Sequence, residues 1–295
     1  MQRSDFDSAA DYAEWARRAG IDLIDRQGRR RGFEGASSSL ALACVPVRQS
    51  KPLRRTHHLT AREFWKTYKG VALANLNGEV MASMLTISWG SLGLSGAAAW
   101  EAHKRFTELF RKWRQARGLS QSWFWVRERG SKLGDHSHIV MNLSWEYGLQ
   151  LVRWAERAVE TISGRPVMRL SRNQRVQTVD LKSERLRQDA EVVRQWELFQ
   201  YLFKGLGPHE EVSIPGDGPG SMNASDLIVR SPRRQGLVVG KRSGLSTELG
   251  PAALAGFLED HPLAFAIREG RGQVAYDDRF MVHARIREGL RRLEI

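Results

Sequence analysis

Apolar and polar residues recur along the chain with two periods, one typical of strands and one typical of helices. The segment Glu79–Trp89 is largely apolar and predicts a strand, which contains the run Met84–Ser88. The segment Trp100–Arg117 predicts an amphipathic helix that ends at Gly118, because its large apolar residues recur at three- and four-residue intervals. These apolar positions are Phe106, Leu109, Phe110 and Trp113.

Two further strands are predicted on either side of a short polar turn. The segments Ser122–Arg129 and His136–Leu143 flank Lys132 and Leu133, and this arrangement predicts a β-hairpin. The aromatic run Trp123–Trp125 lies in the first strand. We expect these rings in the core, and a platform that stacks on bases is the alternative.

Three more helices and one more strand complete the pattern. Thr60 begins a helix as its N-cap, and Glu63 three residues later forms a capping box with it. Helices are also predicted over Ser144–Ser163 and Ser183–Leu206, with a short strand at Val176–Leu181 between them. Strands joined by a hairpin and separated by helices predict an α+β fold, with a mostly antiparallel sheet and helices packed on it.

The two ends of the chain extend beyond this pattern. We expect a basic, partly irregular N-terminal region over residues 1–68, then a domain over 69–207 that contains most of these helices and strands. A Gly- and Pro-rich linker follows at 208–232, and a small C-terminal region of unknown role occupies 233–295. A strand at Gly236–Val239 and helices near Pro251–Asp260 and Met281–Leu293 are predicted within that last region.

Composition points to a polyanionic partner. Lys and Arg number 46 against 33 Asp and Glu, which gives a formal net charge of +13 and favours nucleic acid over an anionic membrane surface. No apolar run approaches the length of a membrane span. Cys44 is the single cysteine, which fits a reducing, cytoplasmic setting.

Basic residues in two segments are candidate DNA contacts. Arg54 and Arg55 lie in the basic stretch before the first helix, and Lys241 and Arg242 lie in a Gly-flanked loop at 240–244. Lys and Arg neutralise backbone phosphates without reading the base sequence. A solvated basic surface is the alternative for each of these residues.

The hairpin also carries residues that bind metals. His136 and His138 point to the same face of their strand, with Cα atoms about 7 Å apart. A turn near Lys132 or Leu133 places Glu128 opposite one of them on that face. Two imidazoles and a carboxylate then form a three-ligand metal site with open positions. The alternatives are a hydrogen-bonded histidine pair and an exposed Glu128 that pairs with Arg127 or Arg129.

A tyrosine and a lysine stand out in the last long helix. Tyr201 and Lys204 are three residues apart on the side opposite an apolar stripe, so Tyr201 is not part of that stripe. A tyrosine hydroxyl beside a metal and a cation is a candidate nucleophile for phosphoryl transfer. A tyrosine packed at the helix edge, with a solvated lysine, is the alternative. The stripe consists of Val192, Trp196, Phe199 and Phe203.

The order of these motifs resembles that of the HUH endonucleases, in particular the single-tyrosine rolling-circle replication initiators of plasmids and filamentous phages. Met84–Ser88 matches the first strand of that family, His136-Ser137-His138 its metal motif, and Tyr201 to Lys204 its nucleophile motif. The resemblance covers about Glu79–Gly207. That family usually has a bulky apolar residue where this chain has Ser137, whose side chain we expect to face away from the metal with altered packing.

The resemblance implies both the fold and the chemistry. It implies a ferredoxin-like-related catalytic domain in which His136, His138 and Glu128 hold Mg²⁺ or Mn²⁺. Tyr201 would attack single-stranded origin DNA to form a 5′-phosphotyrosine, with Lys204 balancing charge, and the free 3′-hydroxyl would prime rolling-circle replication of a plasmid or phage-like element. The host replication machinery is a further candidate partner, and the oligomeric state is left open.

Three other functions remain open at this stage. A single-tyrosine transposase would use the same chemistry. A replication regulator would keep the fold and bind DNA without catalysis. A metal-dependent phosphoesterase would cleave without a covalent step.

Overall fold

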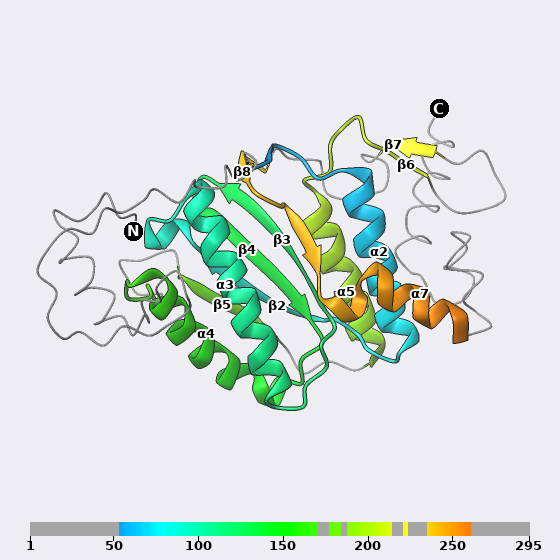
Figure 1. Ribbon diagram of the computed structural model, residues 1–295, viewed down its shortest axis with the longest axis horizontal. Coiled ribbons are helices and arrows are strands. Elements are labelled where there is room, and N and C mark those ends of the chain that lie inside the picture. The colour runs from blue at the N-terminus through cyan, green and yellow to red at the C-terminus, as the bar shows by residue number, and fades with distance from the viewer. Residues whose placement is uncertain (1–52, 170–176, 184–187, 214–220, 224–234, 261–295) are drawn as a thin grey trace, which may run out of the picture. The chain divides into compact units, whose positions relative to one another are not determined.

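Five antiparallel strands form the sheet on which the helices pack (Figure 1). Neighbouring strands pair antiparallel throughout this sheet, which confirms the predicted α+β class. In spatial order the strands are β5 (Val179–Lys182), β2 (Ser83–Ser88), β4 (Gly134–Met141), β3 (Trp123–Gly130) and β9 (Ser243–Leu245).

This computed structural model describes residues 53–169, 177–183, 188–213, 221–223 and 235–260. All of them belong to one compact unit that begins at Pro52. The predicted N-terminal basic region up to residue 52 and the predicted helix near residues 281–293 lie outside the described residues. Within the described part of the chain, no helix is both long enough and apolar enough to cross a membrane.

The predicted hairpin is confirmed, and its pairing is the one that the turn position requires. Strands β3 and β4 pair with Glu128 opposite His136 and are joined by the three residues 131–133. Gly134 follows the turn with φ +61°, and a Cβ there would lie 2.9 Å from the Cα of Gly90. Positions 90 and 134 therefore both need glycine, because the two backbones approach too closely for side chains.

One face of the sheet is covered by α3 (Gly96–Gln115) and α4 (Gly148–Ser163). The predicted helix ends are close to these bounds, and Gly118 after α3 and Gly164 after α4 both have positive φ. The residues buried between these helices and the sheet are rich in tryptophan. They include Trp89, Trp100, Trp113, Trp123 and Trp125.

The opposite face is covered by α2 (Ala61–Leu76) and α5 (Gln188–Phe203). The capping box at Thr60 and Glu63 is present, as predicted. Phe64 of α2 contacts Phe199 and Phe203 edge-on at centroid distances of 5.4 and 5.3 Å. Helix α2 therefore covers the apolar stripe of α5, while the side chain of Val192 lies outside the described residues.

The domain limits differ from those predicted because segments on both sides of the expected catalytic domain complete it. The boundary placed between residues 68 and 69 falls inside α2, and β9, from the C-terminal region, pairs with β3 at the edge of the sheet. The predicted linker contains a short antiparallel pair, β6 (Glu211–Ser213) with β7 (Ser221–Asn223). Apolar burial on α2 and backbone pairing at β9 tie these segments to one core.

The remaining elements are short. Strand β1 (Arg55–Thr56) pairs with β8 (Val238–Val239). Strand β8 is shorter than the strand predicted at Gly236–Val239 and covers only its last two residues. Helix α7 (Pro251–Asp260) has the predicted bounds. The 3₁₀ helices of the described residues are single turns: η2 (Gly90–Leu92), η3 (Trp145–Tyr147) and η4 (Thr247–Leu249).

Candidate metal centre

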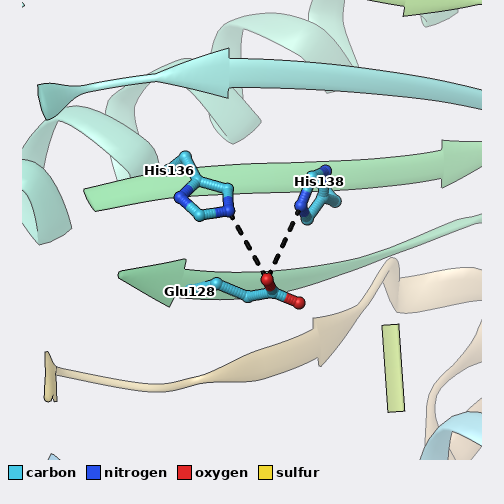
Figure 2. A group of neighbouring side chains, drawn as sticks. All are labelled: Glu128, His136 and His138. Atoms are coloured by element: carbon cyan, nitrogen blue, oxygen red, sulfur yellow. Dashed lines mark ion pairs between the residues drawn. The ribbon is translucent and has the colours of Figure 1, made fainter. Parts of the chain in front are cut away.

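Three side chains meet at one end of the sheet, on the face covered by α2 and α5. His136 and His138 of β4 both point toward Glu128 of β3 (Figure 2). The Nε2 atoms of the two histidines lie 3.5 and 4.0 Å from the same carboxylate oxygen, Oε2. All three residues are buried, which excludes the exposed, edge-pairing reading of Glu128. Their potential ligand atoms lie within 4.8 Å of one another.

Hydrogen bonds on the outer ring nitrogens orient both histidines. Nδ1 of His136 donates to the carbonyl of Gly134 at 2.9 Å, since a carbonyl can only accept. Nδ1 of His138 lies 2.9 Å from the hydroxyl oxygen of Thr86 on β2. These contacts hold both Nε2 atoms toward Glu128, which is how outer-shell partners position metal-binding imidazoles.

Glu128 is the buried anion of the site. Its carboxylate accepts hydrogen bonds from Nζ of Lys204 at 3.0 and 3.2 Å. Burial alone raises the pKa of this carboxyl, but the adjacent His136 and the positive charge of Lys204 outweigh burial and lower the pKa to about 2. The carboxylate is therefore ionised at neutral pH.

His138 is held neutral. Burial, the largest influence, lowers its pKa to about 3, although the nearby Glu128 acts in the opposite direction. Among the described residues, Nε2 of His138 has no hydrogen-bond partner even though the atom is buried. A neutral imidazole with a buried, unused ring nitrogen is the form that binds a metal ion.

The residues present fit a divalent cation. Two ring nitrogens and a carboxylate oxygen converge, and one of those nitrogens is a buried polar atom whose hydrogen bond is missing. A nitrogen and oxygen donor set of this kind suits Mn²⁺ and related divalent ions. His136, His138 and Glu128 would hold the ion, as expected from the sequence.

Helix α5 places Tyr201 beside this centre, and the turn directly after the helix places Lys204 there. The ring of Tyr201 contacts that of His138 edge-on, with centroids 5.8 Å apart. Nζ of Lys204 lies 3.6 Å from the centroid of the Tyr201 ring while it also binds Glu128. Lys204 is thus engaged at the site and is not a solvated residue at the helix end.

A pocket of about 140 Å³ opens next to Tyr201. Lys182 at the end of β5 and Arg194 of α5 contribute two cations to its lining, and Glu197 contributes one carboxylate. Arg194 also pairs with Glu197 at 3.4 Å. The excess of positive charge makes this pocket suitable for a phosphate group close to the tyrosine.

Ser137, between the two histidines, faces the other side of the sheet, as expected. Its hydroxyl accepts a hydrogen bond of 2.8 Å from Nε1 of Trp89. Both residues are fully buried, so the serine satisfies an indole N–H that an apolar residue would leave without a partner. This contact fixes Ser137 on the face of β4 opposite the two histidines.

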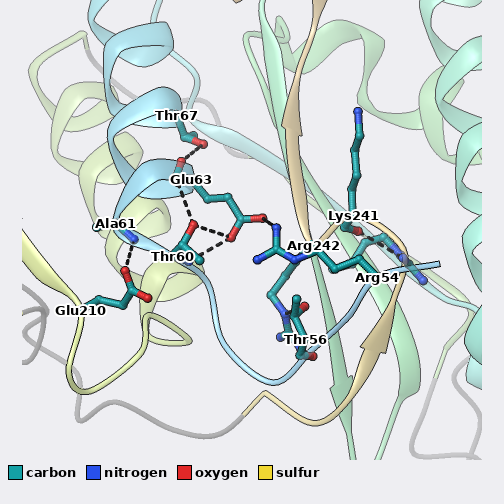
Figure 3. Close-up of polar contacts among 10 residues, drawn as sticks. Arg54, Thr56, Thr60, Ala61, Glu63, Thr67, Glu210, Lys241 and Arg242 are labelled. Atoms are coloured by element: carbon teal, nitrogen blue, oxygen red, sulfur yellow. Dashed lines mark hydrogen bonds and ion pairs between the residues drawn. The ribbon is translucent and has the colours of Figure 1, made fainter. Parts of the chain in front are cut away.

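The four candidate DNA contacts separate into two groups by burial, and Figure 3 shows three of them, Arg54, Lys241 and Arg242. Arg54, Arg55 and Lys241 are exposed, and Arg54 pairs with Glu63 at 4.0 Å. Arg242 is buried, with 1% of its surface exposed, which corrects the expectation that it lies on an open loop.

The guanidinium of Arg242 is occupied inside the protein. Its Nη2 donates to the carbonyls of Thr56 and Gly236, and its Nε donates to the Thr56 hydroxyl at 3.1 Å. Hydrogen bonds to backbone carbonyls of two separate segments therefore stabilise the buried guanidinium, although the sequence alone predicts a solvent-exposed side chain.

Two residues at the centre were not expected from the sequence. Thr86 could have been found from the pairing of β2 with β4, which sets it opposite His138. Gln235 lies next to Glu128 and comes from a segment more than one hundred residues later. No spacing or motif signals Gln235, because only the folding of the C-terminal segment onto β3 brings it there.

Comparison with family models, with curated proteins and with solved structures finds no match for this chain.

Proposed function

We propose that this protein is a metal-dependent endonuclease that nicks and rejoins single-stranded DNA through Tyr201. The observation that carries the proposal is the meeting of two separate parts of the chain. A helix brings a tyrosine and a lysine against a buried Glu-His-His cluster that lies on a hairpin far earlier in the sequence. The same residues carry the resemblance to the rolling-circle replication initiators of the HUH endonucleases.

The proposed reaction is a phosphoryl transfer. The phenol oxygen of Tyr201 attacks the scissile phosphorus, and the bond from phosphorus to the 3′-oxygen breaks. The phenol gives its proton to solvent, and the departing 3′-oxygen takes a proton from solvent to become a hydroxyl. A divalent cation held by His136, His138 and Glu128 supplies positive charge for the phosphoryl oxygens. Attack by a 3′-hydroxyl on the phosphotyrosine reverses the reaction and rejoins the strand.

The cations near Tyr201 support a polyanionic substrate. Lys204 lies over the tyrosine ring, and Lys182 and Arg194 line the adjacent pocket. The formal net charge of +13 extends the attraction to the whole chain. We further propose that the reaction initiates rolling-circle replication of a plasmid or phage-like element.

The test is covalent capture of DNA. A library of random-sequence single-stranded oligonucleotides, labelled at the 3′ end, is incubated with the protein and Mn²⁺ and then denatured in SDS. We expect a labelled protein adduct, because the DNA on the 3′ side of the nick stays on the tyrosine.

Matched variants separate the competing functions. Tyr201→Phe keeps the ring that contacts His138 and should abolish the adduct, as should His138→Ala, whereas Tyr147→Phe should leave it unchanged. Mn²⁺-dependent cleavage that survives Tyr201→Phe would indicate a phosphoesterase without a covalent step. Binding without cleavage or adduct would indicate a replication regulator.

A further inference from the structure

The segment that follows residue 234 closes the metal centre from the side of β3. The side chain of Gln235 ends at Glu128, with its terminal amide 3.2 and 2.5 Å from the two carboxylate oxygens. The amide orientation that satisfies both groups turns the nitrogen toward Glu128, where it donates to both oxygens. Gln235 is buried, with 6% of its surface exposed. The site thus contains a fourth polar side chain in addition to the two histidines and the glutamate.

The backbone on both sides of this glutamine is fixed. Its carbonyl accepts a hydrogen bond of 2.8 Å from the backbone N–H of Arg129, the residue after Glu128. The next residue, Gly236, has φ +65°, and a Cβ there would lie 2.3 Å from the carbonyl oxygen of Arg129. The buried Arg242 donates to the Gly236 carbonyl at 2.6 Å. These contacts hold the start of the C-terminal segment against the end of β3.

Helix α5 leaves space for the side chain. A Cβ on Gly205, directly after Lys204, would lie 2.3 Å from Cγ and 3.3 Å from Cδ of Gln235. A glycine at position 205 therefore lets the glutamine pass between the end of the helix and β3 to reach Glu128. The contact with Glu128 depends on features of three separate segments.

We propose that Gln235 is a fourth ligand of the divalent cation. An amide can present either its nitrogen or its oxygen after rotation about the last side-chain bond. With its nitrogen toward Glu128, the amide donates to the carboxylate. With a cation on Glu128, the oxygen turns inward and joins the carboxylate as a hard oxygen ligand.

The spacing at the site supports this assignment. Adjacent ligands of a six-coordinate ion with bonds of about 2.1 Å are roughly 3 Å apart. The end of the Gln235 side chain lies 2.5 to 3.2 Å from the Glu128 oxygens, and the histidine nitrogens lie 3.5 and 4.0 Å from Oε2. Gln235 is thus as close to the shared carboxylate as the two imidazoles are.

This inference rests on the proposed metal site, and its test does not use nuclease activity. Mn²⁺ is titrated into the full-length protein and followed by electron paramagnetic resonance, and bound water is counted by deuterium spin-echo modulation in D₂O. We expect Gln235→Ala to bind Mn²⁺ roughly tenfold or more weakly. We also expect its bound Mn²⁺ to carry one additional water, in the position that the amide oxygen vacates.

Two further variants guard against a general loss of structure. Gly205→Ala leaves the amide in the chain but displaces it, and should reproduce both effects. Gln195→Ala removes a second buried glutamine, on α5, whose amide oxygen accepts from the backbone N–H of Met81, and should change neither Mn²⁺ affinity nor the water count.

The outcomes distinguish this proposal from the proposed function. Wild-type affinity and water count in Gln235→Ala, alongside lost binding in His138→Ala, would overturn the fourth ligand and leave the three-ligand site intact. No Mn²⁺ binding by the wild-type protein would overturn both the fourth ligand and the metal site. DNA capture through Tyr201 is scored separately in either case.

Discussion

The hydrogen bond between Thr86 and His138 is expected to orient this histidine in the candidate metal centre, and its removal tests that role. The hydroxyl of Thr86 lies 2.9 Å from Nδ1 of His138, on the side of the ring away from Glu128. Thr86→Val removes this hydroxyl with little change of shape. Loss of an outer-shell partner of this kind typically costs 10- to 100-fold in metal affinity, or about 1.4 to 2.8 kcal/mol. The buried Nδ1 left without its partner also costs about 1 to 3 kcal/mol of folding stability.

The assay combines Mn²⁺ titration with thermal unfolding of each variant. Thr86→Ser keeps a hydroxyl and should recover most of the affinity. Thr67→Val is the matched control, since Thr67 is also buried but donates within its own helix, to the carbonyl of Glu63. Mn²⁺ affinity in Thr86→Val equal to that of the wild type would refute the orienting role of this hydrogen bond.

Three other predictions concern charge and packing. Burial lowers the pKa of His138 to about 3 and that of His103 well below its usual range, so the unfolded state binds more protons below pH 6.5. The free energy of unfolding should therefore fall as the pH drops below 6.5, by about 1.4 kcal/mol per pH unit for each histidine. Urea denaturation at a series of pH values should show a shallower fall for His103→Leu than for the wild type. Lys204→Met should raise Mn²⁺ affinity by roughly tenfold, because the ammonium no longer neutralises the buried carboxylate, and weaker Mn²⁺ binding would contradict this. Phe199→Ala should lower the free energy of unfolding by about 3 to 5 kcal/mol, against less than about 0.5 kcal/mol for the exposed Val193→Ala, measured by urea denaturation.

Local patterns were enough to predict most of the secondary structure. The hairpin follows from apolar strands on either side of a polar turn, and its two-residue period sets Glu128 and both histidines on one face. The capping box at Thr60 fixes the start of α2 from four residues alone. Signals of this kind are local, so they can be read without knowledge of the fold.

Long-range placement could not be predicted in the same way. The exposed position expected for Arg242 was wrong because its partners are backbone carbonyls, which leave no trace in the sequence. Gln235 reaches Glu128 only because β9 pairs with β3 and Gly205 leaves space. The domain limits differed for the same reason, since α2 and β9 join the core through burial and pairing that a composition shift does not reveal.

The most direct test of the proposed function is to locate the DNA on the protein. The captured adduct is digested with nuclease and protease, and tandem mass spectrometry then identifies the residue that carries the nucleotide. The chain has 5 tyrosines, so the assignment is discriminating. We predict a nucleotide joined through a 5′-phosphate to Tyr201 and to no other residue. A nucleotide on a different residue, or Mn²⁺-dependent cleavage with no modified peptide, would contradict the proposed mechanism.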